Sequence, residues 1–204
     1  ATVLASCFAG LGLGATFARR GTAYPVRRYG ALELAAAGLA LVSYGVFAAF
    51  ASEQGQRVLE AGGWLARTLV VSLAVLPATV AFGATLPTLA PALAIPSNVG
   101  WRGGLLYSLN TLGGAGGIAA MGFSLPAVIG VRASYLTAAA TSAVAGSLAL
   151  WVGDDELPPR AVPAVRRFAL RFRATAFFTG FLAIGLEVLW IRLFAQVLHN
   201  SVYS

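Results

Sequence analysis

The first residues that could do chemistry are glycines near the start of the chain. The stretch AGLGLGATFARR contains a G-x-G-x-x-A pattern at Gly10, Gly12 and Ala15. In a Rossmann unit this pattern follows a strand, opens a helix and holds a dinucleotide pyrophosphate, and an acidic residue about 20 positions later binds the ribose. Glu33 stands near that distance. The pattern predicts a cofactor loop only if a strand precedes it and a helix begins at it.

The second candidate is a carboxylate, Glu187, inside the apolar stretch GFLAIGLEVLWIRLF. An ionisable side chain at membrane depth costs about 2.5–3.5 kcal/mol on insertion scales, so it is expected to be partnered or functional. Arg192 lies five residues later, about 140° around a helix of 3.6 residues per turn, so the two do not form a simple pair on one face. Two interpretations of Glu187 stay open: a structural hydrogen bond or ion pair, or a site for a cation or a proton.

Other reactive groups are scarce. The chain has one histidine and one cysteine, Cys7, which exclude an internal disulfide and offer no set of metal ligands. The sequence therefore predicts no catalytic residue, no metal and no cofactor within these residues. Asn110, in LYSLNTLGGAGG, is expected either to hydrogen-bond between helices or to line a substrate path.

The elements that must position these residues are membrane helices. Of the 204 residues, 58% are hydrophobic and 10% are charged, whereas soluble domains carry about 25% charged residues. A transmembrane helix needs about 20 mostly apolar residues. We therefore predict an all-α, polytopic integral membrane helix bundle with about six spans. The predicted spans are 1–18, 30–52, 65–89, 103–129, 132–152 and 174–198.

The membrane context changes the interpretation of the opening glycines. The fingerprint lies inside the first apolar run and has no strand before it. Gly10 and Gly14 instead form a G-x-x-x-G pattern, which lets two membrane helices pack closely. Glu33 is then expected to be an interfacial charge near the start of the second span, paired with Arg27 or Arg28.

Two interior stretches are irregular. Four prolines are expected to break or kink the third span and its exit, namely Pro77, Pro87, Pro91 and Pro96. The fourth span contains Asn110 and, after it, five glycines. Broken helices near the midplane are where transporters bind substrates. The other interpretation is that these are kinked helices, packed through Gly113 and Gly117.

The placement of arginine predicts the topology, because cytoplasmic loops retain positive charge. All 14 basic residues are arginines, and most of them fall on alternate loops that we assign to the cytoplasm. These are Arg19, Arg20, Arg27, Arg28, Arg102, Arg160, Arg166, Arg167, Arg171 and Arg173. Arg57, Arg67 and Arg132 fall on the opposite side. Both chain ends are then expected on the outer side of a multi-pass protein in the cell (inner) membrane.

Three motifs together give a resemblance to a known family. GFLAIGLEVLWIRLF with the trailing NSVYS, FGATLPTL, and LYSLNTLGGAGG resemble the membrane part of the spermidine synthase-like membrane proteins. These combine a major facilitator-like membrane region with a spermidine synthase domain. In that family a glutamate, a tryptophan and an arginine mark the first helix of a membrane half, and Glu187, Trp190 and Arg192 match this pattern. In that family, segments similar to residues 83–87 and 110–113 of this chain occur later in the same membrane half.

The resemblance implies a domain organisation. Residues 1–153 would form five transmembrane helices of a first half, 154–173 a cytoplasmic linker rich in proline and arginine, and 174–204 the first helix of a second half. The order of the motifs also implies an excerpt from a longer protein. Any aminopropyl transfer by the parent protein would lie outside these residues, so the sequence leaves enzyme activity open.

Three hypotheses for the function follow. The chain is a transporter-like module for polyamines or related cations, with Glu187 and Asn110 lining the path. Alternatively, it is a non-catalytic membrane anchor for a synthase domain elsewhere, or an accessory or scaffold subunit packed in a larger membrane complex. The expected partners are the lipid bilayer and the remaining half of the same protein or neighbouring membrane subunits, with no nucleic acid.

Overall fold

Every element that the structure describes is helical. The structure is a computed structural model and describes residues 2–18, 23–93, 99–153 and 170–197. The chain divides into two units, Ala1–Pro159 and Arg160–Ser204. The first contains α1 (Thr2–Phe17), α2 (Pro25–Phe50), α3 (Glu53–Ala61), α4 (Gly63–Leu93), α5 (Val99–Ala119), the π-helical turn η1 (Ala120–Ser124) and α6 (Leu125–Val152). The second contains α7 (Leu170–Val197). The predicted all-α class is confirmed for these ranges.

Four helical stretches of the described residues are long and apolar enough to cross a membrane: Pro25–Phe50, Gly63–Ala90, Gly103–Val152 and Leu170–Gln196. Six spans were expected. One difference is at the start, where α1 has 16 residues and falls short of the roughly 20 needed for a span. The other is at 103–152, where the two expected spans form one stretch of 50 residues that continues across a kink at Gly130.

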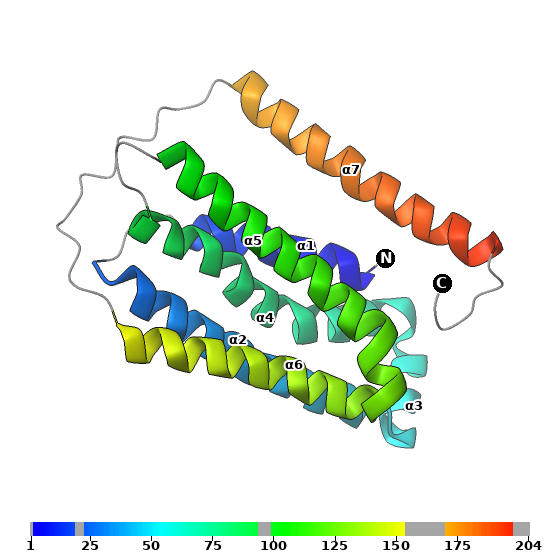
Figure 1. The fold of residues 1–204 in the computed structure, drawn as a ribbon. Helices are drawn as coiled ribbons and strands as arrows, with labels where there is room; N and C mark the ends of the chain where they lie inside the picture. Colours follow the sequence, from blue (N-terminus) through cyan, green and yellow to red (C-terminus); the bar gives the residue numbers. More distant parts are fainter. Residues whose placement is uncertain (1, 19–22, 94–98, 154–169, 198–204) are drawn as a thin grey trace. The chain divides into compact units, whose positions relative to one another are not determined.

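This long stretch folds back on itself. Gly130 has φ 80° and ψ 160°, which is not helical. It lies between the expected spans 103–129 and 132–152. Figure 1 shows α5 and α6 meeting at one end and running back beside the bundle as two separate arms. Glycine can adopt this backbone region, whereas residues with a Cβ essentially do not.

The non-helical residue gives a first prediction. Gly130→Ala should lower the free energy of unfolding by about 1–3 kcal/mol, because the alanine must occupy a region open only to glycine. Gly114→Ala is the matched control. Gly114 lies inside helical α5 with nothing within 4 Å of a built Cβ, so alanine should leave stability unchanged or raise it. Denaturation in mixed micelles measures both variants, and equal effects would contradict the hairpin at Gly130.

Four helices of the first unit pack side by side in the order α1, α4, α2, α6. α1 runs parallel to α4, because residues near 6, 10 and 14 meet residues near 72, 79 and 83 in the same order. α2 is antiparallel to both of its long neighbours (Figure 1). Among the described elements of this unit, α5 contacts only α4 and η1.

The α1–α4 contact rests on glycine. A Cβ at Gly10 would collide with the Thr79 side chain, and one at Gly14 would collide with the carbonyl oxygen of Val80. A Cβ at Gly83, on α4, would collide with the Leu11 backbone. The two backbones therefore approach closely where small residues face one another, as is typical of membrane helix pairs. The Ser6 and Ser72 hydroxyls, 2.9 Å apart, add a hydrogen bond across the same interface.

α4 is continuous through Pro77 and Pro87, so the expected break of the third span is absent from its described residues. A proline within a helix frees carbonyl oxygens, and serine or threonine hydroxyls can satisfy them. The Ser43 hydroxyl of α2 donates to the Ala74 carbonyl, three positions before Pro77. On α4 itself, the Thr85 hydroxyl donates to Phe82 O at 2.7 Å, near Pro87. α4 nevertheless continues as one helix of 31 residues.

Candidate functional site

The candidate site is a polar cluster between α2 and α6, formed by Tyr29, Glu33 and Ser142. Tyr29 and Glu33 are four residues apart, so both lie on one face of α2. Ser142 comes from α6. Glu33 is 8% exposed, which makes it the one charged residue among the buried side chains that the structure describes. Tyr29 and Ser142 are partly exposed, so the cluster lies at the α2–α6 interface with only Glu33 buried.

Two hydroxyl groups hydrogen-bond to the Glu33 side chain. Ser142 Oγ lies 2.5 Å from Glu33 Oε2, and it also lies 3.2 Å from the backbone oxygen of Glu33. The Tyr29 side chain hydrogen-bonds to the same carboxyl group. Hydrogen bonds to ionised or strongly polarised oxygens are short, typically about 2.5–2.7 Å for a hydroxyl donor. The carboxyl group is thus held by neutral partners.

Glycines bring the two backbones close enough for this contact. A Cβ at Gly146 would lie 2.8 Å from the Gly30 backbone oxygen and 3.0 Å from Glu33 Cβ, and a Cβ at Gly30 would lie 2.7 Å from the Gly146 backbone oxygen. This close approach is about one helical turn from the Glu33–Ser142 bond. Serine has a short side chain, so its hydroxyl reaches Glu33 only across such a narrow gap.

A second pair of contacts fixes the register of α2 against α6. The Tyr135 hydroxyl donates to the Ala40 carbonyl at 2.8 Å. The rings of Tyr44 and Tyr135 also pack together, with centroids 5.4 Å apart. These contacts lie about two turns from Ser142, so α6 is attached to α2 at two levels.

Charged side chains are few near the cluster. The described part of α4 carries one, Arg67, and that of α6 carries one, Arg132. Arg132 is ten residues from Ser142, or about 15 Å along the helix. Arg67 lines the same hollow as Phe47 and Phe50, at the far end of α2. Among the described residues no arginine forms an ion pair with Glu33, so the expected pairing with Arg27 or Arg28 gives way to the two hydroxyls.

Arg27 has a different role at the beginning of α2. Its guanidinium lies over the Tyr24 ring, 5.7 Å from the centroid, and beside Gly153, which follows the last residue of α6. A cation at the C-terminal end of a helix interacts favourably with the helix dipole and the last carbonyl oxygens. Arg27 therefore stabilises the end of α6.

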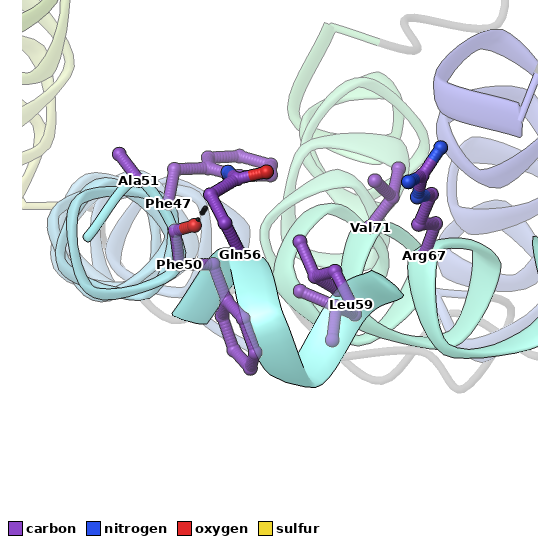
Figure 2. Close-up of a pocket in the computed structure, with 8 residues that line it drawn as sticks. Phe47, Phe50, Ala51, Gln56, Leu59, Arg67 and Val71 are labelled. Carbon is purple, nitrogen blue, oxygen red and sulfur yellow. Dashed lines mark hydrogen bonds between the residues drawn. The ribbon is translucent and has the colours of Figure 1, made fainter. Parts of the chain in front are cut away.

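A hollow lies at the opposite end of α2, where α3 connects α2 to α4. It has a volume of about 420 Å³, and residues of all three helices and the turn after α2 line it. Figure 2 shows Gln56 turned toward Phe50, whose carbonyl oxygen accepts a hydrogen bond from Gln56 Nε2 at 2.8 Å. The remaining lining is mostly apolar, with Arg67 the one charged group. No carboxylate is among its lining residues.

The α7 candidates lie on one helix of the second unit. Glu187, Trp190 and Arg192 all belong to α7, and among the described residues Glu187 and Arg192 form no ion pair with each other. This agrees with their separation of about 140° around the helix. No described contact tests the function of these three residues.

The remaining predicted residues fall into two groups. Gly10 and Gly14 lie in the close α1–α4 contact, whereas Gly113 and Gly117 have nothing within 4 Å of a built Cβ. Asn110 is exposed on α5, together with those two glycines. The structure thus brings Gly10 and Gly14 to one interface but gives α5 no packed face in its described unit.

Sequence reasoning missed Tyr29 and Ser142 entirely and interpreted Glu33 as an interfacial charge paired with Arg27 or Arg28. The signal that could have found Glu33 is its place in YGALELAAAG, nine residues into a span and four after a tyrosine. No group of three or more metal-binding side chains occurs among the described residues. No protein-family model, curated protein or solved structure matches this chain.

Proposed function

We propose that this chain is a membrane-embedded module of a transporter-like protein for polyamines or related organic cations. The observation that carries the proposal is Glu33, a buried carboxyl group held by two hydroxyls rather than by an arginine. An ionisable residue within a membrane helix is costly, so its presence in a bundle interior favours a role in binding or moving charge. Amines are the natural partners of a carboxylate in such a place.

The wider layout belongs to the same proposal. The chain would contribute six membrane-crossing segments to a two-half, major facilitator-like region of the spermidine synthase-like kind. Arg27 and Arg28 would lie at the cytoplasmic side of the inner membrane, and both chain ends would lie outside. Four apolar helices of sufficient length and the basic beginning of α2 support this arrangement. Glu187 and Asn110 stay predicted members of the path.

Reconstitution tests the transport proposal. The full-length protein in lipid vesicles should take up labelled spermidine in a saturable way, and Glu33→Gln should reduce uptake to that of empty vesicles, because glutamine keeps the shape but cannot carry the charge. Glu60→Gln is the matched control, since Glu60 is an exposed glutamate on α3, and it should transport like the wild type. Wild-type vesicles that take up no polyamine or other organic cation, or a fully active Glu33→Gln, would contradict the proposal.

A second function, an anchor or scaffold subunit, is favoured by α5. Its described side chains are almost all exposed, including Asn110, and a polar amide in lipid lacks hydrogen-bond partners. A neighbouring membrane helix against α5 would supply them. A correctly folded wild-type protein without any uptake would favour this alternative.

A further inference from the structure

The hollow between α2, α3 and α4 combines an apolar lining with a single charge. Phe47, Phe50, Val70 and Val71 line it, and Arg67 is the one charged residue among its lining residues. Figure 2 shows the two phenylalanines on one side of the hollow and Arg67 with Val71 on the other. Its volume of about 420 Å³ lies within the range of about 300–1,000 Å³ that is usual for ligand sites. The lining therefore suits a ligand that is partly apolar and partly anionic.

The positive charge of Arg67 is available to such a ligand. The one ion pair within the described ranges joins Arg57 and Glu53 of α3, at 3.9 Å, and no acidic residue lines the hollow. The Gln56 amide, which also lines it, donates to the Phe50 carbonyl oxygen at 2.8 Å. Arg67 is thus the cation that this hollow offers, and a guanidinium group matches a phosphate with two parallel hydrogen bonds.

The hollow lies where two candidate membrane spans are joined. One span ends at Phe50, the next begins at Gly63, and the short helix α3 connects them. Trp64, in the first turn of α4, is 78% exposed, and tryptophan is enriched at the level of the lipid headgroups. Arg67 is one turn further along, and a long arginine side chain can extend to the same level. The charged part of the hollow is therefore expected at the depth of the lipid phosphates.

From these observations we propose that the hollow binds one anionic phospholipid, with its phosphate on Arg67 and an acyl chain along the apolar lining. Phe47 lies one turn before the end of α2, and Val70 and Val71 lie one turn beyond Arg67 on α4. These residues are thus on the side of the hollow toward the interior of the bilayer. A free phosphate would use only the arginine, whereas a phospholipid covers the charge and the apolar surface together. The proposal does not depend on what the module transports.

Native mass spectrometry tests the proposal on the full chain. The protein is equilibrated in detergent with phosphatidylglycerol or with phosphatidylcholine, and the Kd of the first bound lipid is measured for each. The wild type should prefer phosphatidylglycerol, and Arg67→Gln should weaken its binding about fivefold, the effect of one arginine near an anionic membrane surface. Binding of phosphatidylcholine should not change. Arg67 is exposed, so glutamine should leave the fold intact.

Arg132→Gln is the matched control. Arg132 is also exposed, and it lies one turn before Tyr135, which contacts Ala40 and Tyr44 of α2. It is therefore near the same end of the unit but does not line the hollow. This variant should keep the wild-type preference, because the charge that it removes is outside the site.

Three results would overturn the proposal. The first is a wild type that binds both lipids equally, and the second is an equal effect of Arg67→Gln and Arg132→Gln, which would indicate general attraction between charges. The third comes from competition with inorganic phosphate against chloride at the same ionic strength. Phosphate should displace no more lipid than chloride does, and greater displacement would identify a site for a free anion instead. These measurements need no transport, so they are independent of the proposed function.

Discussion

Replacing Gly14 by leucine should unfold much of the α1–α4 interface, while the same change at Gly12 should have little effect. A Cβ at Gly14 would collide with Val80 O and lie 2.8 Å from Ala84 N, and both atoms belong to the α4 backbone, which cannot move aside like a side chain. Overpacking a well-packed interior costs about 1–3 kcal/mol, and occasionally more. We expect the upper end of this range or beyond, because a whole leucine must fit between two backbones.

Gly12 provides the matched control on the same helix. It is exposed, and nothing lies within 4 Å of a built Cβ there. Leucine also has a better helix propensity than glycine. The measurement is the folded fraction recovered in detergent together with the midpoint of unfolding in mixed micelles. Similar losses for Gly12→Leu and Gly14→Leu would show that the position on α1 is not what matters. Retention of a nicotinamide or flavin cofactor by the wild type, lost in either variant, would instead restore the Rossmann interpretation.

Replacing Gly146 by leucine should have the second large effect, because it removes both the close α2–α6 approach and the Glu33 cluster. Its Cβ would lie 2.8 Å from Gly30 O and 3.0 Å from Glu33 Cβ. Separating the helices also breaks the Ser142–Glu33 bond. Overpacking lowers stability by about 1–3 kcal/mol. Loss of a hydrogen bond to a charged or ionisable group lowers it by about a further 1.5–3 kcal/mol. We expect a total loss of stability of about 3–5 kcal/mol.

The control for Gly146 is Gly38→Leu on α2, where nothing lies within 4 Å of a built Cβ. That variant should unfold at nearly the wild-type midpoint. Ser142→Ala separates the two contributions, since it removes the hydroxyl without adding volume, and it should cost only the hydrogen-bond part. If Ser142→Ala were as damaging as Gly146→Leu, the polar contact rather than the close backbone approach would hold α6 in place.

The sequence predicts the helical class well because composition and run length are local properties. Long apolar runs leave no alternative to helices in a membrane, since every backbone polar group must be satisfied internally. The spacing of Gly10 and Gly14 likewise suggests a close helix contact, but a spacing cannot name the partner. The partner helix is α4, where Gly83 lies opposite Leu11. This pairing depends on the packing of the whole unit.

The parts that sequence reasoning missed are tertiary. Four prolines predict a third span that is broken or kinked, yet α4 is unbroken over Gly63–Leu93. Glu33 is visible as a charge in an apolar run, but its partner Ser142 is an ordinary residue in TAAATSAVAG. Nothing in either stretch indicates that the two meet, because only the close approach at Gly30 and Gly146 brings them together.

The distance between these two residues along the chain has a consequence for synthesis. Glu33 and Ser142 are 109 residues apart. A ribosome that adds about 5–20 residues per second needs on the order of ten seconds to make the stretch between them. During that interval α2 must enter the bilayer with Tyr29 as the one member of the cluster already made. The Glu33 carboxyl group therefore lacks its Ser142 hydrogen bond until α6 has been made.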